Sequence, residues 1–173
     1  DLGASSGRII LVTLLDDTLH LEEVHRFSND PVIVNGTMYW DTLRHFFEIK
    51  QGIVKATQKG GFESIGIDTW GVDFGLLDEH GDLLESAVHY RDDRTLGMQE
   101  EVFKVIPKEE VYNLTGNQFE NFNTIFQLYS LVQKRPWILE KADTLLLTPD
   151  LFNYFLTGEK KAEYTMATTT QLM

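Results

Sequence analysis

The sequence predicts an α/β protein in which a mixed β-sheet is flanked by helices. Two patterns carry this prediction: hairpin-like pairs of strands near the start of the chain, and helices alternating with strands after them. The chain has 173 residues, of which 42% are hydrophobic and 24% are charged, as in ordinary globular proteins. This length suffices for one domain with a sizeable core. We therefore expect a single domain that spans residues 1–173.

Two hairpins are expected first. Residues 8–15 form an apolar run, Asp16-Asp17 marks a turn, and residues 18–27 return with partial alternation of apolar and polar side chains. Asn35-Gly36 lies between two further short apolar runs, and this dipeptide is the strongest short-range hairpin signal. The start of the chain is therefore expected to form a β-meander.

A long helix follows the hairpins. Its apolar side chains recur at a helical period, Asp41 caps its start, and Gly60-Gly61 ends it just after Lys59. Beyond it, short apolar runs between turn and capping residues predict strands alternating with helices. These are a strand at 64–67, strands at 74–77 and 83–84 about a His80-Gly81 turn, helices at 95–105 and 109–114, a helix from Asn123 or Thr124 to Lys134, a strand at 144–147, and a helix at 151–156 that Asp150 caps and Gly158 ends.

Charge and composition exclude several classes of function. The net charge of −12 argues against nucleic acid as a partner, because nucleic-acid binding needs a basic surface. No apolar run approaches the length of a membrane span, and no export signal is visible, so no membrane partner is expected. The chain has no cysteine, which excludes disulfides and thiolate metal sites, and its histidines lack metal-ligand spacing. We expect a cytoplasmic protein.

The segment Asp1-Leu2-Gly3-Ala4-Ser5-Ser6-Gly7-Arg8 is the most informative in the chain. Small residues let backbone amides approach an anion closely, and a neighbouring carboxylate can hold a divalent cation through water. The segment fits neither a Walker A loop nor a dinucleotide-binding fingerprint, and it leads from one strand into another. It predicts a site for nucleotide phosphates and their metal; the alternative is a hairpin turn with a surface aspartate.

Further segments give the chain a resemblance to a known family. With the Asp1–Arg8 segment, residues 64–78, 90–95 and 115–119 resemble the N-terminal domain of FGGY-type carbohydrate kinases along essentially the whole chain. A narrower likeness, to the members that phosphorylate L-rhamnulose, is carried by residues 65–74, 122–124 and 164–172. The resemblance implies the ribonuclease H-like fold of actin-like ATPases, with ATP and Mg²⁺ as cofactors.

The resemblance assigns the nucleotide side of the site to the Asp1–Arg8 segment. It implies that Asp1 holds Mg²⁺ through water, and the alternative is a carboxylate that only caps the loop amides. Arg8 is expected to contact the nucleotide, or else to pair with an acidic side chain. Asp68, at the end of an expected strand, would orient the loop or the metal's water shell, or be a buried structural residue. The phosphate-binding amides and hydroxyls would come from Ala4, Ser5, Ser6 and Gly7.

The resemblance assigns the sugar side to residues further along the chain. The Trp70 ring would pack on an apolar sugar face, although core packing is the commoner fate of a tryptophan. Asp73 would accept hydrogen bonds from sugar hydroxyls or pair with Arg91 or Arg94. Asn123 is either a sugar ligand or a plain helix cap. The full expected set is Trp70, Gly71, Asp73, Gln118, Phe122 and Asn123, with Gly71 as a position that sets specificity.

The roles of two other stretches, residues 90–94 and 168–171, are less specifically indicated by the sequence. Residues 90–94 form either a salt-bridged loop or part of the wall near the sugar. The polar run 168–171 is expected to connect the sheet to a hinge, with hydroxyls that can face the same cleft. A carboxylate pair of Asp68 and Asp73 for hydrolysis is disfavoured, because residues five apart on a strand point to opposite faces.

The resulting expectation is an ATP-dependent ketose kinase, with L-rhamnulose phosphorylated at its 1-hydroxyl. The chain is expected to be truncated at both ends. A C-terminal domain of the same polypeptide would supply the catalytic aspartate and the adenosine pocket, so no catalytic residue is assigned here and this fragment alone is expected to be inactive. The alternatives are a kinase for L-fuculose, D-xylulose or another polyol, and a non-catalytic module that binds sugar or nucleotide.

Overall fold

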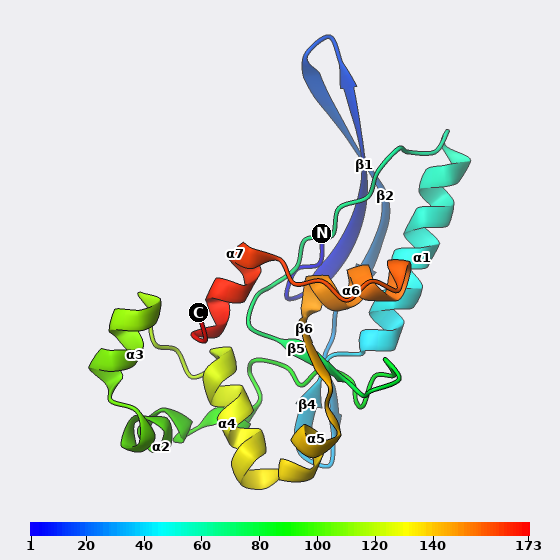
Figure 1. Ribbon diagram of the computed structural model, residues 1–173. Coiled ribbons are helices and arrows are strands. Elements are labelled where there is room, and N and C mark those ends of the chain that lie inside the picture. The colour runs from blue at the N-terminus through cyan, green and yellow to red at the C-terminus, as the bar shows by residue number, and fades with distance from the viewer.

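The computed structural model describes residues 1–173 (Figure 1). Its strands pair in antiparallel twos, and its helices lie around them. In chain order the elements are β1 (Ser6–Leu15), β2 (Thr18–Ser28), β3 (Val32–Val34), β4 (Thr37–Tyr39), α1 (Thr42–Gln58), β5 (Phe74–Leu77), the 3₁₀ turn η1 (Asp93–Thr95), α2 (Met98–Val105), α3 (Lys108–Thr115), α4 (Thr124–Lys134), α5 (Pro136–Lys141), β6 (Thr144–Leu147), α6 (Thr148–Thr157), α7 (Tyr164–Ala167) and the 3₁₀ turn η2 (Thr168–Thr170).

Strands β1 and β2 form a long hairpin that projects from the body of the molecule (Figure 1). The pairing runs from Ser6 opposite Ser28 to Leu15 opposite Thr18, and its register shifts once, between Ile9 and Ile10. Such a bulge bends a hairpin and increases its twist. The base of the hairpin, on the near side of this bulge, contacts helix α1.

Helix α1 packs against the base of this hairpin (Figure 1). Asp41 caps its start by accepting a hydrogen bond from the Arg44 amide at 3.1 Å. Gly52 allows the close approach, because a Cβ atom at this position would lie 2.2 Å from the Ile9 side chain. The prediction of a capped helix that ends at Gly60-Gly61 is confirmed within a residue.

Strands β5 and β6 lie at the centre of the molecule and pair antiparallel, with Phe74 opposite Leu147. All side chains of β5 are buried, and helix α6 follows directly from β6 and packs across both strands. Gly75 lets α6 come close, since a Cβ there would lie 2.7 Å from Leu151. Because β5 is buried on both faces, the residues before it are held rigidly against the core.

Helices α2, α3 and α4 form a second lobe on the far side of β5 and β6 from the hairpin (Figure 1). Met98, Val102 and Phe126 are the buried centre of the contact between α2 and α4. Helix α7 lies between this lobe and the hairpin, near the end of the chain (Figure 1). The loops that meet between these parts contain most of the residues expected to bind ligands.

The expected α/β class is confirmed, although three separate antiparallel strand pairs stand in place of the expected mixed sheet; both hairpins, the β5 and β6 strands and the α1 and α4 helices lie where the sequence places them. The expected strand at 64–67 is wrong, because no strand lies beside it to receive its hydrogen bonds. Only Leu2 meets the end of this stretch, through an isolated parallel bridge to Thr69. The second strand of the 74–84 hairpin is reduced to a single bridge between Leu77 and Leu83.

Two helix boundaries also differ from expectation. Gly97, with a φ of +78°, separates the turn η1 from helix α2, so residues 95–105 are not one helix. Asp150 does not cap α6; it lies in the first turn, and its carboxylate accepts a hydrogen bond from the Glu163 amide at 3.2 Å. Helix α5 was not expected. None of the helices is long and apolar enough to traverse a lipid bilayer.

Candidate functional site

The Asp1–Arg8 loop is closed at its base by paired backbone hydrogen bonds. The Arg8 amide donates to the Asp1 carbonyl at 2.7 Å, and the Asp1 nitrogen donates to the Arg8 carbonyl at 3.0 Å. Within the loop, the Gly3 amide donates to the Ser6 carbonyl at 2.9 Å. These bonds fold the small residues between them into a tight turn at the start of β1.

Asn29, at the end of β2, ties this turn to the hairpin. Its side-chain Nδ2 donates to the Gly3 carbonyl at 2.6 Å, and its backbone amide donates to the Ser5 carbonyl at 3.1 Å. Asn29 is 1% exposed, so both bonds are shielded from water. Gly7 lies against the Phe27 ring, and a Cβ atom there would come within 2.1 Å of the ring. Asn29 was not among the expected residues; a lone asparagine after a strand carries no recognisable signal.

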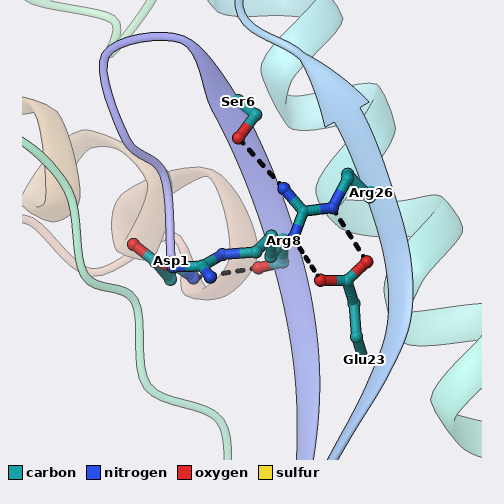
Figure 2. A network of polar contacts seen from close by, with 5 residues as sticks. All are labelled: Asp1, Ser6, Arg8, Glu23 and Arg26. Carbon is teal, nitrogen blue, oxygen red and sulfur yellow. Dashed lines mark hydrogen bonds and ion pairs between the residues drawn. The ribbon is translucent and has the colours of Figure 1, made fainter.

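The loop keeps groups free for an anion. The Ala4 and Ser5 amides donate to no protein acceptor, and both residues are exposed. The Ser6 hydroxyl accepts from Nη1 of Arg26 at 3.3 Å, and Arg26 also forms an ion pair with Glu23 (Figure 2). Free amides beside a hydroxyl and guanidinium groups are the donor set that phosphate oxygens need.

Asp1 and Arg8 lie side by side at the base of the loop and form an ion pair (Figure 2). Arg8 therefore takes up the acid pairing that was its alternative role. Only Oδ2 of Asp1 is bonded to Arg8, and Oδ1 makes no hydrogen bond, so the carboxylate keeps an oxygen for a cation's water. Both side chains are partly exposed, which leaves them accessible to a ligand.

A cleft of about 650 Å³ lies on the segment that is hydrogen-bonded to this loop. We call it the Trp70 cleft. The connection is direct, because the Leu2 amide donates to the Asp68 carbonyl at 2.8 Å, two residues before Trp70. Asp68 itself is exposed, not buried as one alternative had it. The cleft is lined by Trp70, Gly71, Val72, Tyr90, Asn117, Gln118, Glu120, Phe122, Asn123 and Thr169.

The structure therefore brings together all the expected sugar-side residues except Asp73. Gly71 lies next to Thr169, which confirms that a hydroxyl of the 168–171 run faces the cleft. Phe122 packs edge-to-face on Tyr90, with ring centroids 5.9 Å apart. Aromatic rings and amide side chains on one cleft wall can bind both the apolar face and the hydroxyls of a polyol.

The contacts of Asn123 bear on both of its expected roles, as a sugar ligand and as a helix cap. It stands at the N-cap position of α4, but its side chain caps no helix amide; Oδ1 accepts from the Glu120 amide at 2.6 Å. Its Nδ2 makes no hydrogen bond to protein, and the residue lines the cleft. Gln118 and Glu120 bond to each other through their side chains, and Gln171 holds the Gln118 carbonyl at 2.7 Å. The cleft wall is thus built from a loop that its own side chains fix.

Asp73 lies behind the cleft and not in it, which corrects its expected role as a direct ligand. Its side chain is 0% exposed. Oδ2 accepts from the indole nitrogens of Trp40 and Trp70 at 2.6 and 3.0 Å and from the Tyr90 amide at 3.1 Å. Burial raises the pKa of Asp73 to about 6, although these hydrogen bonds oppose the shift. Asp73 therefore acts on the cleft by orienting Trp70 and Tyr90.

Asp73 pairs directly with neither Arg91 nor Arg94. Gln127 of α4 stands between: its Nε2 donates to Oδ1 of Asp73 at 3.0 Å, and its Oε1 accepts from Nη2 of Arg94 at 2.6 Å. Burial lowers the pKa of Arg94, and the nearby Asp73 charge opposes that shift. The charged side chains of residues 90–94 do not form ion pairs with each other, so the salt-bridged-loop interpretation is wrong.

The chain turns sharply at Val72. The Asp73 amide donates to the Gly71 carbonyl at 2.9 Å across Val72, which has a φ of +67°. This is a γ-turn with a left-handed central residue, a rare and strained form. A β-branched residue in this region costs on the order of 1–3 kcal/mol and persists only where its surroundings impose it. The strain lies on the cleft wall.

An array of aromatic rings runs from the Asp1–Arg8 loop to the cleft. Trp40, 1% exposed, stacks between Trp70 and His89 at centroid distances of 4.0 and 3.8 Å. His45 packs against Phe27 at one end of the array and against Trp40 and Trp70 at the other. Desolvation lowers the pKa of both His45 and His89 to about 4, so both are neutral near pH 7.

Known proteins resemble this chain along its whole length. A family model for the FGGY family of carbohydrate kinases, N-terminal domain, matches residues 1–173. Rhamnulokinase from Oceanobacillus iheyensis is 52% identical over 174 residues, which cover 100% of this chain and 37% of that protein. Rhamnulokinase from Bacteroides thetaiotaomicron is 45% identical over 174 residues, with coverages of 100% and 36%.

Solved structures share the fold at low sequence identity. A ligand-bound xylulose kinase from Lactobacillus acidophilus superposes with a TM-score of 0.82 at 17% identity, covering 99% of this chain and 35% of that one. Plasmodium falciparum glycerol kinase with ADP superposes with a TM-score of 0.74 at 19% identity, covering 99% and 36%. The chain spans little more than a third of the length of the curated relatives it matches. It belongs to the FGGY family of carbohydrate kinases, whose N-terminal domain it matches from end to end.

Proposed function

We propose that the protein phosphorylates L-rhamnulose at its 1-hydroxyl, with ATP as donor, and that this chain supplies the sugar cleft and the phosphate loop. One observation carries the proposal: a loop with free amides leads directly, through the bond between Leu2 and Asp68, into a cleft lined by rings and amides. Relatives named rhamnulokinase, 44–52% identical along the whole chain, support the choice of sugar.

The residues of the Asp1–Arg8 loop fit a nucleotide's phosphates. The Ala4 and Ser5 amides have no protein acceptor, the Ser6 hydroxyl is available beside Arg26, and Gly7 leaves no Cβ in the turn. Oδ1 of Asp1 is free to accept a hydrogen bond from a water of Mg²⁺. ATP would supply the transferred phosphoryl group, and Mg²⁺ would screen its charge. Arg8, paired with Asp1 here, would then also hold a phosphate oxygen.

The residues of the Trp70 cleft fit a deoxy-ketose. The rings of Trp70 and Phe122 offer apolar surface, Nδ2 of Asn123 offers a donor to hydroxyls, and Asn117, whose Nδ2 donates to the Thr168 carbonyl, offers its Oδ1 as an acceptor. Gly71 leaves room beside Thr169 where any side chain would narrow the cleft. The cleft has no basic side chain, which suits an uncharged sugar better than a sugar acid.

The rest of the active site is proposed to lie in a C-terminal domain of the same polypeptide. That domain would supply the aspartate that takes the hydroxyl proton and the pocket for adenosine. It would also close over the cleft and exclude water, which prevents wasteful hydrolysis of ATP. Positioning and charge stabilisation would then account for most of the catalysis. We further propose that the enzyme works in the cytoplasm and that this domain alone is inactive.

The test is an ADP-release assay on the full-length protein with L-rhamnulose, L-fuculose, D-xylulose and glycerol as separate substrates. We expect Mg²⁺-dependent turnover that is highest with L-rhamnulose. Asn123→Asp, which keeps the acceptor for Glu120 but loses the cleft donor, should raise the KM for the sugar. Asn121→Asp makes the same charge change outside the cleft and should leave it unchanged. Higher activity on another polyol overturns the choice of sugar, and no turnover by folded protein favours a non-catalytic module.

A further inference from the structure

Gln127 lies where the walls of the Trp70 cleft meet, although it does not line the cleft. It is 1% exposed, on the first turn of α4. Its Nε2 donates to the Phe122 carbonyl at 2.8 Å, to Oδ1 of Asp73 at 3.0 Å and to the Val72 carbonyl at 3.3 Å. One amide group therefore touches both chain segments that carry the apolar lining of the cleft.

Arg94 fixes the orientation of the Gln127 amide. Oε1 of Gln127 accepts from Nη2 of Arg94 at 2.6 Å, and Arg94 can only donate. The NH₂ group must therefore face Val72, Asp73 and Phe122, all of which present acceptors. A glutamate at this position has no donor and adds a negative charge beside Asp73. A glutamine accepts from Arg94 on one side and directs its two N–H donors at these three acceptors on the other, with Val72 at the longest distance, 3.3 Å.

A second clamp from the same helix holds the same turn. The Thr124 hydroxyl donates to the Val72 carbonyl at 2.7 Å, and Thr124 is fully buried. Val72 is the left-handed centre of the strained γ-turn. Its carbonyl accepts hydrogen bonds from two buried side chains of α4, Thr124 and Gln127. The flanking Gly71 lines the cleft, while the Asp73 side chain is buried behind it and accepts from the Trp70 indole.

We propose that Gln127, oriented by Arg94 and assisted by Thr124, is a positioning residue that holds the γ-turn at Val72 and the Phe122 wall in sugar-binding register. This role rests on the proposed function, since it concerns the affinity of the same cleft for its sugar. Gln127 touches no substrate. It acts through the backbone of Val72 and Phe122 and through the carboxylate of Asp73. Phosphate binding by the Asp1–Arg8 loop is independent of these contacts.

The test compares full-length wild type with Gln127→Met, which keeps the side-chain length but loses every one of these bonds. We expect the KM for L-rhamnulose to rise at least tenfold while the KM for ATP changes less than twofold. Misplacement of binding groups has effects of this size. Ser130→Ala is the matched control, because Ser130 is equally buried on α4 and donates only to the Gln127 carbonyl. It should leave both KM values unchanged.

A second pair of variants keeps the test decisive if Gln127→Met fails to fold. Thr124→Ser retains the hydroxyl and should keep the wild-type KM for the sugar, whereas the isosteric Thr124→Val should raise it. Equal increases in the KM for sugar and ATP, or no increase in either variant, overturn the proposal while wild-type turnover still stands. Absence of L-rhamnulose turnover in the wild type is a different result, and it counts against the proposed function.

Discussion

Substitution of Asp73 by asparagine should abolish a titration that occurs near pH 6 in the wild-type protein. Burial raises the pKa of Asp73, whereas the pKa values of His45 and His89 in the aromatic array are lowered. The indoles of Trp40 and Trp70 both donate to Asp73. Asparagine keeps the shape and an acceptor for Trp40 and Trp70 but carries no charge at any pH. The variant therefore removes the ionisation; its Nδ2 also replaces the acceptor of Gln127, a loss that is the same at every pH and cancels in a comparison across pH.

The size of the effect follows from the pKa of about 6 against an ordinary value of 3.8. A shift of this size corresponds to roughly 3 kcal/mol. Because the folded pKa is raised, the folded protein holds the proton more tightly than the unfolded chain does. The contribution is fully present below the unfolded value, and it is lost as the pH rises through 6. About half of the loss, roughly 1.5 kcal/mol, falls between pH 5 and pH 7.5.

The assay is native tryptophan fluorescence of the full-length protein from pH 5 to pH 8. A carboxylate that gains charge beside two indole N–H groups changes their emission, so the wild type should show a step near pH 6. Asp73→Asn should show none. His45 and His89 titrate near pH 4, below this window. Trp137 is the control, because it is 54% exposed and makes no hydrogen bond to Asp73. Trp137→Phe should therefore retain the step.

Urea unfolding of the same proteins gives the matching energy. The difference in unfolding free energy between Asp73→Asn and wild type should grow by roughly 1.5 kcal/mol in favour of the variant from pH 5 to pH 7.5. A step that persists in Asp73→Asn, or a free-energy difference that does not change with pH, would refute the reasoning. Either result would mean that the Asp73 carboxylate is better solvated than its burial indicates.

Three further substitutions probe the two halves of the site. Gly7→Ala puts a Cβ against Phe27, so it should cost about 1–3 kcal/mol of stability and raise the KM for ATP more than that for sugar in steady-state kinetics. Asn29→Ala removes the bond to the Gly3 carbonyl, and it should cost about 1 kcal/mol in unfolding experiments and raise the KM for ATP. Trp70→Leu should raise the KM for L-rhamnulose about tenfold and leave the KM for ATP within twofold.

Local signals account for the elements that the sequence predicts correctly. The Asp16-Asp17 and Asn35-Gly36 turns both have left-handed residues, as their hairpins require. Asp41 caps α1 by an interaction three residues away, and the glycine at 158 adopts the left-handed conformation that ends α6. Each of these features depends only on neighbours in the sequence, so a single sequence contains the information.

The errors concern contacts over long sequence distances. Whether residues 64–67 form a strand depends on which chain segment lies beside them, and their own apolar character does not specify one. Asp73 is drawn into the core by Trp40, 33 residues before it, and Gln127, 54 residues after it. The left-handed Val72 follows from the same contacts and from no local preference. The sequence motifs therefore predict the residues that line the cleft, but not the buried contacts of Asp73 with Trp40 and Gln127 that support it.

The most direct measurement is calorimetric titration of L-rhamnulose into full-length wild-type, Gly71→Ala and Gly66→Ala proteins. The three atoms nearest to a Cβ at Gly71 all belong to Thr169, at 3.4 Å or more, so alanine fits the protein but intrudes on the cleft. A Cβ at Gly66 meets nothing within 4 Å and lies outside the cleft. We predict that wild type and Gly66→Ala bind L-rhamnulose equally and that Gly71→Ala binds at least fivefold more weakly. Equal affinity in all three proteins, or no binding by folded wild type, would contradict the assignment of the Trp70 cleft as the sugar site.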